Sequence, residues 1–147
     1  MKILIEKAAR RLTLLDEAGK ALFTAPIALG SHPLGPKERE GDGKTPEGRY
    51  FVCLKKTGKY GPSLGISYPG AADALRAGAD PALLACIRRR EEAGERPPWG
   101  SPLGGEICIH GGGVHADWTA GCIALNDADA QALYDVVPLE TEIEILS

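Results

Sequence analysis

The chain of 147 residues has the length of one domain, residues 1–147, and its hydrophobic content of 44% is enough for a buried core. The net charge of −3 argues against a nucleic-acid partner, because phosphate binding favours a basic face. No stretch approaches the roughly 18 apolar residues that a membrane span needs. The N-terminal apolar run, Ile3–Ile5, is too short for the core of a signal peptide, so the sequence predicts a soluble chain in which nothing directs export.

Short strands joined by turns dominate the predicted elements, in keeping with 19 glycines, 11 prolines and only 5% aromatic residues. Segments 10–16 and 21–30 flank the polar turn 17–20 and predict a hairpin. Residues 41–54 predict a loop that leads into a strand, because Thr45–Gly48 has turn chemistry. Further strands are expected at 2–6, 106–110 and 141–146, the last from its alternation of Glu and Ile.

Helices are expected to be the minority. Residues 80–94 predict a helix that begins with Asp80 as its N-cap and ends at Gly94, and a short helical turn is expected within 67–78. Residues 126–137 open with capping residues and then place apolar side chains at helical spacing, which predicts a helix with one buried face. The expected fold class is therefore mainly β, with a small helical insertion in the middle and one helix near the C-terminal end.

The four cysteines are widely spaced and include no CxxC pair, so they do not suggest a disulfide framework. Cys53 and Cys86 lie in apolar runs and are expected to be small buried hydrophobes. Cys108 alternates with isoleucines and shares its side-chain direction with His110, so it is expected near any site at that histidine, as a spectator. Cys122 differs, because it follows a Thr-Ala-Gly turn and precedes an apolar run.

Residues 110–122, HGGGVHADWTAGC, concentrate the candidate chemistry. Three interpretations of this stretch stay open on the residues alone. Cys108, His110, His115 and Cys122 are ligand types that zinc prefers, but their spacing is irregular for a structural zinc site. The stretch could instead be a glycine-rich hairpin whose cysteine packs in the core. The third interpretation is a thiol nucleophile with an imidazole base.

The nucleophile interpretation makes specific geometric demands on this stretch. The loop of eleven residues after His110 can return Cys122 to its side. His110 ends a strand and is a firmer base than His115, which lies within the loop, while His32 is far away in sequence. Gly121 allows a tight turn, so that the N–H groups of residues 120–122 can face a carbonyl oxygen.

Several motifs resemble the L,D-transpeptidase (YkuD-type) catalytic domain. The segments IHG and DWTAGCIAL resemble its HG and S/T-x-GC signature, in the form found in one branch of the family. GDGKTPEGRYFV, LGISYPGAADALRAG, GGEICIHG and the C-terminal segment resemble further family motifs in the same order, so the resemblance covers about residues 2–146. It implies a YkuD-type β-sandwich that acts on peptidoglycan stem peptides in the cell envelope, with no metal or cofactor.

The resemblance also implies roles for individual residues. Cys122 matches the nucleophile that forms a thioester with a stem-peptide carbonyl, which then passes to an amine acceptor. His110 matches the histidine that activates this thiol and protonates the leaving amine, and the carbonyl of Gly111 orients that imidazole. The nearby imidazole is expected to lower the pKa of the Cys122 thiol.

The remaining site residues lie in the loop and the turn. Ala120 and Gly121 match the turn that stabilises an oxyanion, and Thr119 matches the family's Ser/Thr position. His115, Asp117 and Trp118 are expected to form a substrate wall beside the nucleophile, and Thr119 is a further candidate for substrate binding with Trp118 and His115. The alternative for Trp118 is that it anchors the loop to the core.

The sequence departs from the family at a few positions. Many members have a histidine where this chain has Ala120 and an arginine where it has Ala124, and its loop is shorter than in many members. Lys37 and Arg49 are candidates to hold a substrate carboxylate, or else ordinary surface charges. The main alternative function is a hydrolase with the same Cys/His chemistry, and the second is a non-catalytic cell-wall-binding or zinc-stabilised domain.

Overall fold

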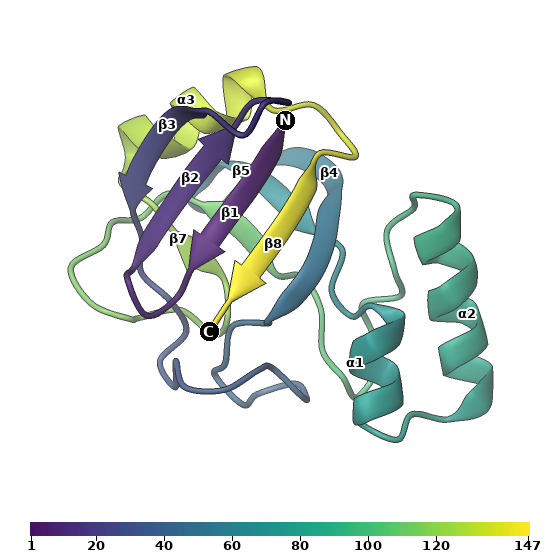
Figure 1. The fold of residues 1–147 in the computed structure, drawn as a ribbon. Helices are drawn as coiled ribbons and strands as arrows, with labels where there is room; N and C mark the ends of the chain where they lie inside the picture. Colours follow the sequence, from purple (N-terminus) through teal and green to yellow (C-terminus); the bar gives the residue numbers. More distant parts are fainter.

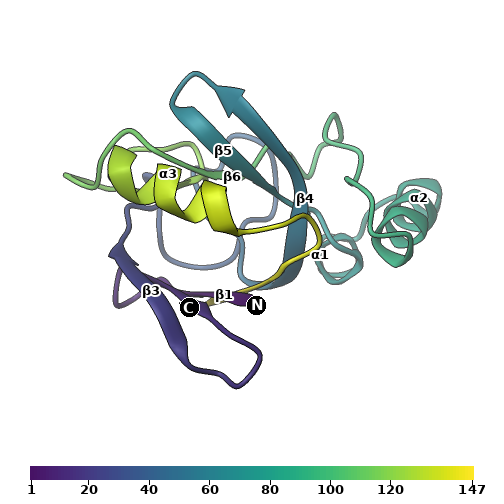
Figure 2. The ribbon, with the colours of Figure 1, turned by 90° about the horizontal axis from the view of Figure 1, so that it is seen from above.

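The computed structural model describes residues 1–147 and confirms a mainly β fold. One sheet of eight strands, in the order β3-β2-β1-β8-β4-β5-β6-β7, curls so that its two halves face each other (Figures 1 and 2). The strands are β1 (Lys2–Glu6), β2 (Arg11–Leu15), β3 (Ala21–Pro26), β4 (Gly48–Gly58), β5 (Gly61–Ile66), β6 (Cys108–His110), β7 (Ile123–Ala124) and β8 (Glu142–Leu146), and the helices are α1 (Ala71–Arg76), α2 (Pro81–Glu92) and α3 (Asp127–Val136). None of these helices has the length and hydropathy that a membrane span requires.

The first half of the sheet, β3-β2-β1-β8, follows from the alternation of apolar residues. Ile3 in β1 pairs with Ile143 in the parallel strand β8, and both side chains are fully buried. The predicted hairpin of β2 and β3 is confirmed. Its turn is closed by the Asp16 carboxylate, which accepts hydrogen bonds from the N–H groups of Ala18 (2.9 Å) and Lys20 (2.8 Å).

The long strand β4 joins the two halves. Its first residues pair with β8 and its later residues pair with β5, and the register shifts between Val52 and Leu54. Such an irregularity bends a strand, and Figure 2 shows β4 passing from one half to the other. The sequence analysis missed β5, because Gly61, Pro62 and Gly65 hide its strand pattern.

Two predicted strands are shorter than expected. The strand expected at 21–30 ends at Pro26, and the residues beyond it form only isolated bridges, from Ala28 to Ala124 and from Gly30 to Thr119. The strand expected at 106–110 begins at Cys108. Residues 27–30, which follow β3, thus reach the edge of the sheet that carries β7 without forming a regular strand.

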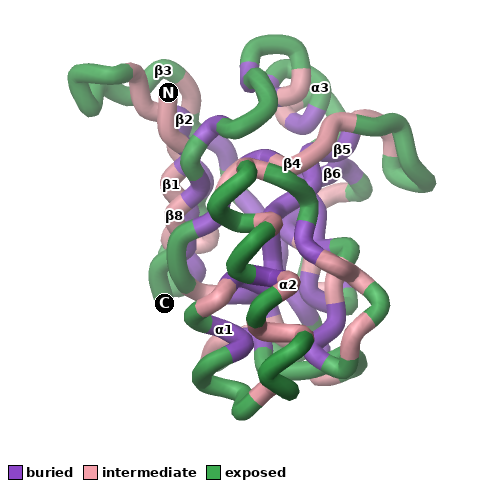
Figure 3. The backbone as a smooth tube through the Cα atoms, turned by 90° about the vertical axis from the view of Figure 1, so that its right-hand side faces the viewer, coloured by how far each residue is buried: buried purple, intermediate pink, exposed green.

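The main hydrophobic core lies between the two halves of the sheet and beneath α3 (Figure 3). Helix α3 packs on β5 and contributes Ala130 and Leu133 to this core. The expected helical insertion is present as α1 and α2, which lie beside the sheet in Figure 1. These helices bury only a small cluster of their own around Ala74 and Ile87.

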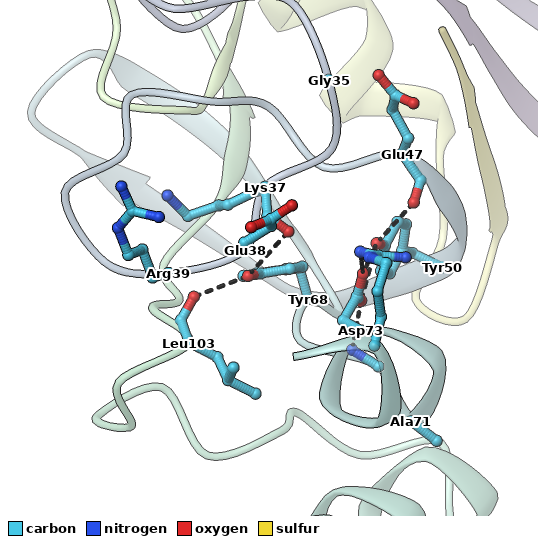
Figure 4. Close-up of polar contacts among 12 residues, drawn as sticks. Gly35, Lys37, Glu38, Arg39, Glu47, Tyr50, Tyr68, Ala71, Asp73 and Leu103 are labelled. Carbon is cyan, nitrogen blue, oxygen red and sulfur yellow. Dashed lines mark hydrogen bonds and ion pairs between the residues drawn. The ribbon is translucent and has the colours of Figure 1, made fainter. Parts of the chain in front are cut away.

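A buried carboxylate fastens this insertion to the sheet (Figure 4). Asp73 of α1 accepts hydrogen bonds from the Tyr50 hydroxyl in β4 (2.9 Å) and from the Gly70 N–H (2.9 Å), and it pairs with Arg76 (2.9 Å). Burial raises the pKa of Asp73, and these three partners offset the effect only in part. The burial of the Asp73 carboxylate therefore requires these hydrogen-bond partners, and the partners in turn use Asp73 as their acceptor.

We expect Asp73→Ala to lower the free energy of unfolding by about 1–3 kcal/mol, because it leaves the Gly70 N–H without its acceptor and the Tyr50 hydroxyl with only the Glu47 carbonyl at 3.2 Å. Asp80→Ala is the matched control in the same insertion, since Asp80 is exposed and its side chain makes no capping bond. This control should change stability by no more than about 0.5 kcal/mol. Urea unfolding measures both variants, and equal losses would contradict the anchoring role.

Candidate active site

The two strands that carry the candidate residues are short and parallel. In β6 and β7, Ile109 pairs with Ile123 and His110 pairs with Ala124. Both isoleucines are buried in the core, and side chains alternate along a strand, so His110 and Cys122 belong to the opposite face. Both line one cavity of about 160 Å³, together with Cys108. The structure therefore brings together the thiol and the imidazole, as the return loop predicted.

His110 is held in one orientation by its own backbone neighbour. Its Nδ1 lies 2.6 Å from the carbonyl oxygen of Gly111. Because a carbonyl only accepts hydrogen bonds, Nδ1 carries the proton and Nε2 is left with a free lone pair. Burial lowers the pKa of His110, and the bond to Gly111 offsets this in part. The ring is thus a neutral imidazole near pH 7, with Nε2 as its basic atom.

Cys122 is half-buried and makes two hydrogen bonds, one to the first residue of β6 and one to the segment before this strand. Its Sγ accepts from the N–H of Cys108 (3.4 Å), and its thiol donates to the carbonyl of Glu106 (3.6 Å). The expected lowering of the thiol pKa is wrong. Burial raises the pKa of Cys122, the Cys108 N–H and the charges of Lys37 and Lys56 oppose it only in part, and no hydrogen bond joins the thiol to His110.

The turn before Cys122 is stabilised by hydrogen bonds among its own residues. The Thr119 hydroxyl accepts from the Gly121 N–H (3.1 Å) and donates to the Cys122 carbonyl (2.7 Å). Thr119 is buried, so its place favours shaping the turn over contact with a substrate. The N–H groups of Ala120 and Cys122 bond to no atom of the protein, whereas that of Gly121 is already used.

Gly121 is required by the shape of this turn. Its φ of +142° lies in the region that favours glycine, and an added Cβ would stand 2.7 Å from the carbonyl oxygen of Lys44. The loop around residue 44 therefore packs directly against Gly121, the residue that precedes Cys122. A side chain at position 121 would push these two segments apart.

The loop between His110 and Cys122 is pinned at Asp117 and Trp118. Asp117 forms an ion pair with Arg10 (2.8 Å) and accepts from the Leu29 N–H (2.9 Å). Trp118 donates from its indole N–H to the Gly113 carbonyl (2.9 Å), and the exposed His115 ring is parallel to the indole with 6.4 Å between centroids. Neither Trp118 nor His115 lines the cavity that holds the thiol.

The sequence analysis missed Tyr60, at the tip of the hairpin of β4 and β5. Its ring stacks on His110, with 4.7 Å between centroids and 18° between planes, and it meets Trp118 edge-on. The cavity wall is built largely by this hairpin. The lining residues are Lys56, Gly58, Lys59, Tyr60, Ser63, Glu106, Cys108, His110 and Cys122. A second cavity of about 390 Å³ adjoins it and shares Lys59 and Tyr60.

The two candidate carboxylate binders lie in different environments. Arg49 is an exposed surface charge, 3.9 Å from Glu144 and absent from the cavity walls. Lys37 is buried instead, with only 2% of its side chain exposed, and forms an ion pair of 2.8 Å with the equally buried Asp42. Lys37 is therefore neither a surface charge nor free to meet a substrate in solution.

The zinc interpretation finds no support in this arrangement. No group of three or more His, Cys, Asp or Glu side chains is placed to hold a metal ion. All four cysteines are free thiols; Cys108 is buried beside Cys122, and Cys53 and Cys86 are half-buried rather than fully buried as expected. Burial raises the pKa of Cys108 to about 12, which keeps this neighbouring thiol protonated.

Comparison with known protein families identifies the family of this chain. The family model of the L,D-transpeptidase catalytic domain, YkuD, matches residues 1–145. The chain belongs to this family. Its members are peptidoglycan enzymes, so the resemblance of the sequence motifs is confirmed at the level of the family. No curated protein matches the chain at a significant level.

Several solved structures share the fold of this chain. The helical cell shape determining protein Pgp2 from Campylobacter jejuni is 25% identical, with a TM-score of 0.70 over 97% of this chain and 46% of that one. Bd1075 from Bdellovibrio bacteriovorus is 21% identical (TM-score 0.65, 99% and 47% covered), and L,D-transpeptidase 1 from Mycobacterium tuberculosis is 15% identical (0.58, 99% and 61%). This chain spans about half the length of these relatives.

We expect alkylation of Cys122 by iodoacetamide to have a pH midpoint above about 8.5, because burial raises the pKa of the thiol. The thiolate fraction should therefore be small at pH 7 and rise through the alkaline range. Mass spectrometry of the Cys122 peptide measures the rate, and Cys122→Ala gives the background from the other three thiols. A midpoint below pH 7 would indicate a preformed thiolate–imidazolium pair instead.

Proposed function

We propose that this chain is one catalytic domain, residues 1–147, of a cysteine-dependent L,D-transpeptidase that acts on peptidoglycan stem peptides in the cell envelope. The observation that carries the proposal is the shared cavity of Cys122 and His110, where the imidazole presents an unprotonated Nε2. The family assignment supports the substrate class. The chemistry follows from these groups without a cofactor.

The first half of the reaction makes a thioester. His110 Nε2 takes the proton of the Cys122 thiol as the sulfur attacks a stem-peptide carbonyl carbon. The imidazolium then protonates the leaving amine, the C–N bond breaks, and the acyl group remains on sulfur. Because both groups are neutral at rest, this proton transfer accompanies the attack rather than preceding it.

The second half releases the acyl group. The amine of a second stem, or of another acceptor, attacks the thioester carbonyl and gives its proton to His110. The C–S bond breaks and the sulfur regains a proton, which restores the starting state. The amides of Ala120 and Cys122 are the free donors of the turn and are suited to the oxyanion in both halves.

The surroundings of the cavity fit a peptide with free carboxylates. Lys56 and Lys59 stand in the wall of the cavity, and the adjoining cavity of about 390 Å³ extends the site past Tyr60 toward Asp127 and Gln131. A stem peptide that reaches Cys122 would thus pass two cationic side chains. Trp118 and His115 contribute from outside, by holding the aromatic contact on Tyr60.

We expect imipenem to add one drug mass to the protein, because attack of the thiol opens the β-lactam ring without a leaving group. The structure of an LD transpeptidase, LdtMt1, has been determined in complex with imipenem. Intact-mass spectrometry should show the adduct in wild type and in Cys108→Ala, whose thiol lies in the same cavity, but not in Cys122→Ala. Equal labelling of wild type and Cys122→Ala would refute Cys122 as the nucleophile.

The fate of the thioester separates a transferase from a hydrolase. We expect incubation with purified stem peptides to yield a new amide between donor and acceptor, together with the released fragment. Mass spectrometry of the products distinguishes this amide from a shortened free stem, and His110→Gln should abolish both products. Release of the fragment without any new amide, even at high acceptor concentration, would identify a hydrolase with the same Cys/His chemistry.

A further inference from the structure

Lys37 is a buried cation behind the turn that carries the nucleophile. Its ammonium donates to Asp42 at 2.8 Å, and both side chains are only 2% exposed. The backbone carbonyl of Lys37 lies 3.4 Å from the Tyr68 hydroxyl, which also donates to Leu103 (Figure 4). A charge that is so deeply buried is rare unless it is paired, and its placement calls for a reason.

The partner carboxylate is fixed by the backbone. Asp42 accepts hydrogen bonds from the N–H groups of Glu38 (2.8 Å), Arg39 (3.1 Å) and Lys44 (3.1 Å). Although burial works against ionisation, these bonds and Lys37 together lower the pKa of Asp42 to about 2. Asp42 is therefore a permanent anion that holds the Lys37 ammonium in one place.

That place is next to the residue before Cys122. A Cβ built on Gly121 would stand 3.6 Å from Lys37 Nζ and 2.7 Å from the Lys44 carbonyl oxygen. The bridge between Gly30 and Thr119 joins the chain that leads to Lys37 to the same turn. The ammonium thus lies next to the turn that precedes Cys122, and Lys37 is not one of the residues that line the cavity.

The charges that face Cys122 come from several elements. Lys56 of β4 and Lys37 are positive, while Glu106, before β6, is negative; Cys108 and His110 of β6 are neutral. Lys56 and Glu106 stand in the open cavity, where water screens them. Lys37 is shielded from water, so its field at Cys122 is screened less than that of Lys56, although the Asp42 carboxylate at 2.8 Å opposes part of it.

We propose that Lys37 is a positioning residue for Cys122: its buried ammonium stabilises the negative charge that forms on the sulfur and on the attacked carbonyl oxygen. The effect on the oxyanion rests on the proposed transpeptidase chemistry, whereas the effect on the thiolate does not. Lys37 acts through the Gly121 turn and through space, without touching a substrate. The pair with Asp42 keeps the cation in this position.

Lys7 offers a matched control in the same part of the fold. It is also buried, with 3% exposed, pairs with Glu47 at 3.0 Å, and donates to the carbonyls of Gly35 (3.0 Å) and Thr45 (2.8 Å). Lys7 therefore fastens the same segment as Lys37, but none of the three atoms nearest to a Cβ built on Gly121 belongs to Lys7, whereas Lys37 Nζ is one of them. Substitution of Lys7 therefore measures the effect of losing a buried lysine from this segment while the charge of Lys37 next to Cys122 stays in place.

We expect Lys37→Met and Lys37→Gln each to raise the pH midpoint of Cys122 alkylation by about one unit, which at neutral pH is about a tenfold smaller thiolate fraction. Lys37→Arg keeps the charge and should restore the midpoint of wild type. Lys7→Met should lower stability toward urea and leave the midpoint unchanged. Lys37→Gln keeps a hydrogen-bond donor for Asp42, so it remains informative where Lys37→Met does not fold.

Two results would overturn the proposal. One is a midpoint in both neutral variants equal to that of wild type; the other is an equal rise in Lys7→Met or Lys37→Arg, which would assign the effect to packing. Imipenem acylation is followed in parallel and should slow about tenfold in the neutral variants. If wild type is not acylated, the transpeptidase proposal fails, while the alkylation midpoints still decide the effect of Lys37 on the thiolate.

Discussion

The parallel pairing of β6 with β7 is the constraint on which the site depends. Because Ile109 lies opposite Ile123, the core takes both isoleucines, and His110 and Cys122 are left on the same outer face. Strands of three and two residues cannot hold this register alone. The register is secured by Ala124, which exchanges two backbone hydrogen bonds of 2.9 Å with Ala28, so β7 is clamped from both sides.

The clamp explains why distant parts of the chain converge on the loop of the site. The segment after β3 reaches β7 only because Pro26 ends that strand and the chain continues irregularly. Asp117 then binds Arg10 and the Leu29 N–H, so one carboxylate ties the loop to the turn after β1 and to this same segment. The first half of the sheet, which carries no candidate residue, thereby fixes the position of Cys122.

Local patterns predicted the elements that have local causes. The hairpin of β2 and β3, the alternation of β8 and the helices α2 and α3 follow from neighbouring residues. Strand β5 was missed because its glycines and proline resemble a turn. Without this strand, the position of Tyr60 over His110 could not be predicted either. Lys37 was taken for a possible surface charge because it stands in the polar run PKERE. The burial of Lys37 depends on its ion pair with Asp42 and on Gly104, where an added Cβ would stand 3.2 Å from Lys37 Cε.

Burial acts in opposite directions on the two reacting groups and leaves both uncharged. It raises the pKa of Cys122 and lowers that of His110, so a resting ion pair is disfavoured on both sides. A protonated thiol reacts slowly with oxidants and stray electrophiles, because the thiolate is the nucleophilic form. In the proposed reaction a charge forms only while the sulfur attacks, and the Cys108 N–H at the sulfur and the Lys37 ammonium beside Gly121 lie close to it. The fold thus keeps the thiol protonated and unreactive at rest, and in the proposed reaction it stabilises the charge that forms on the sulfur.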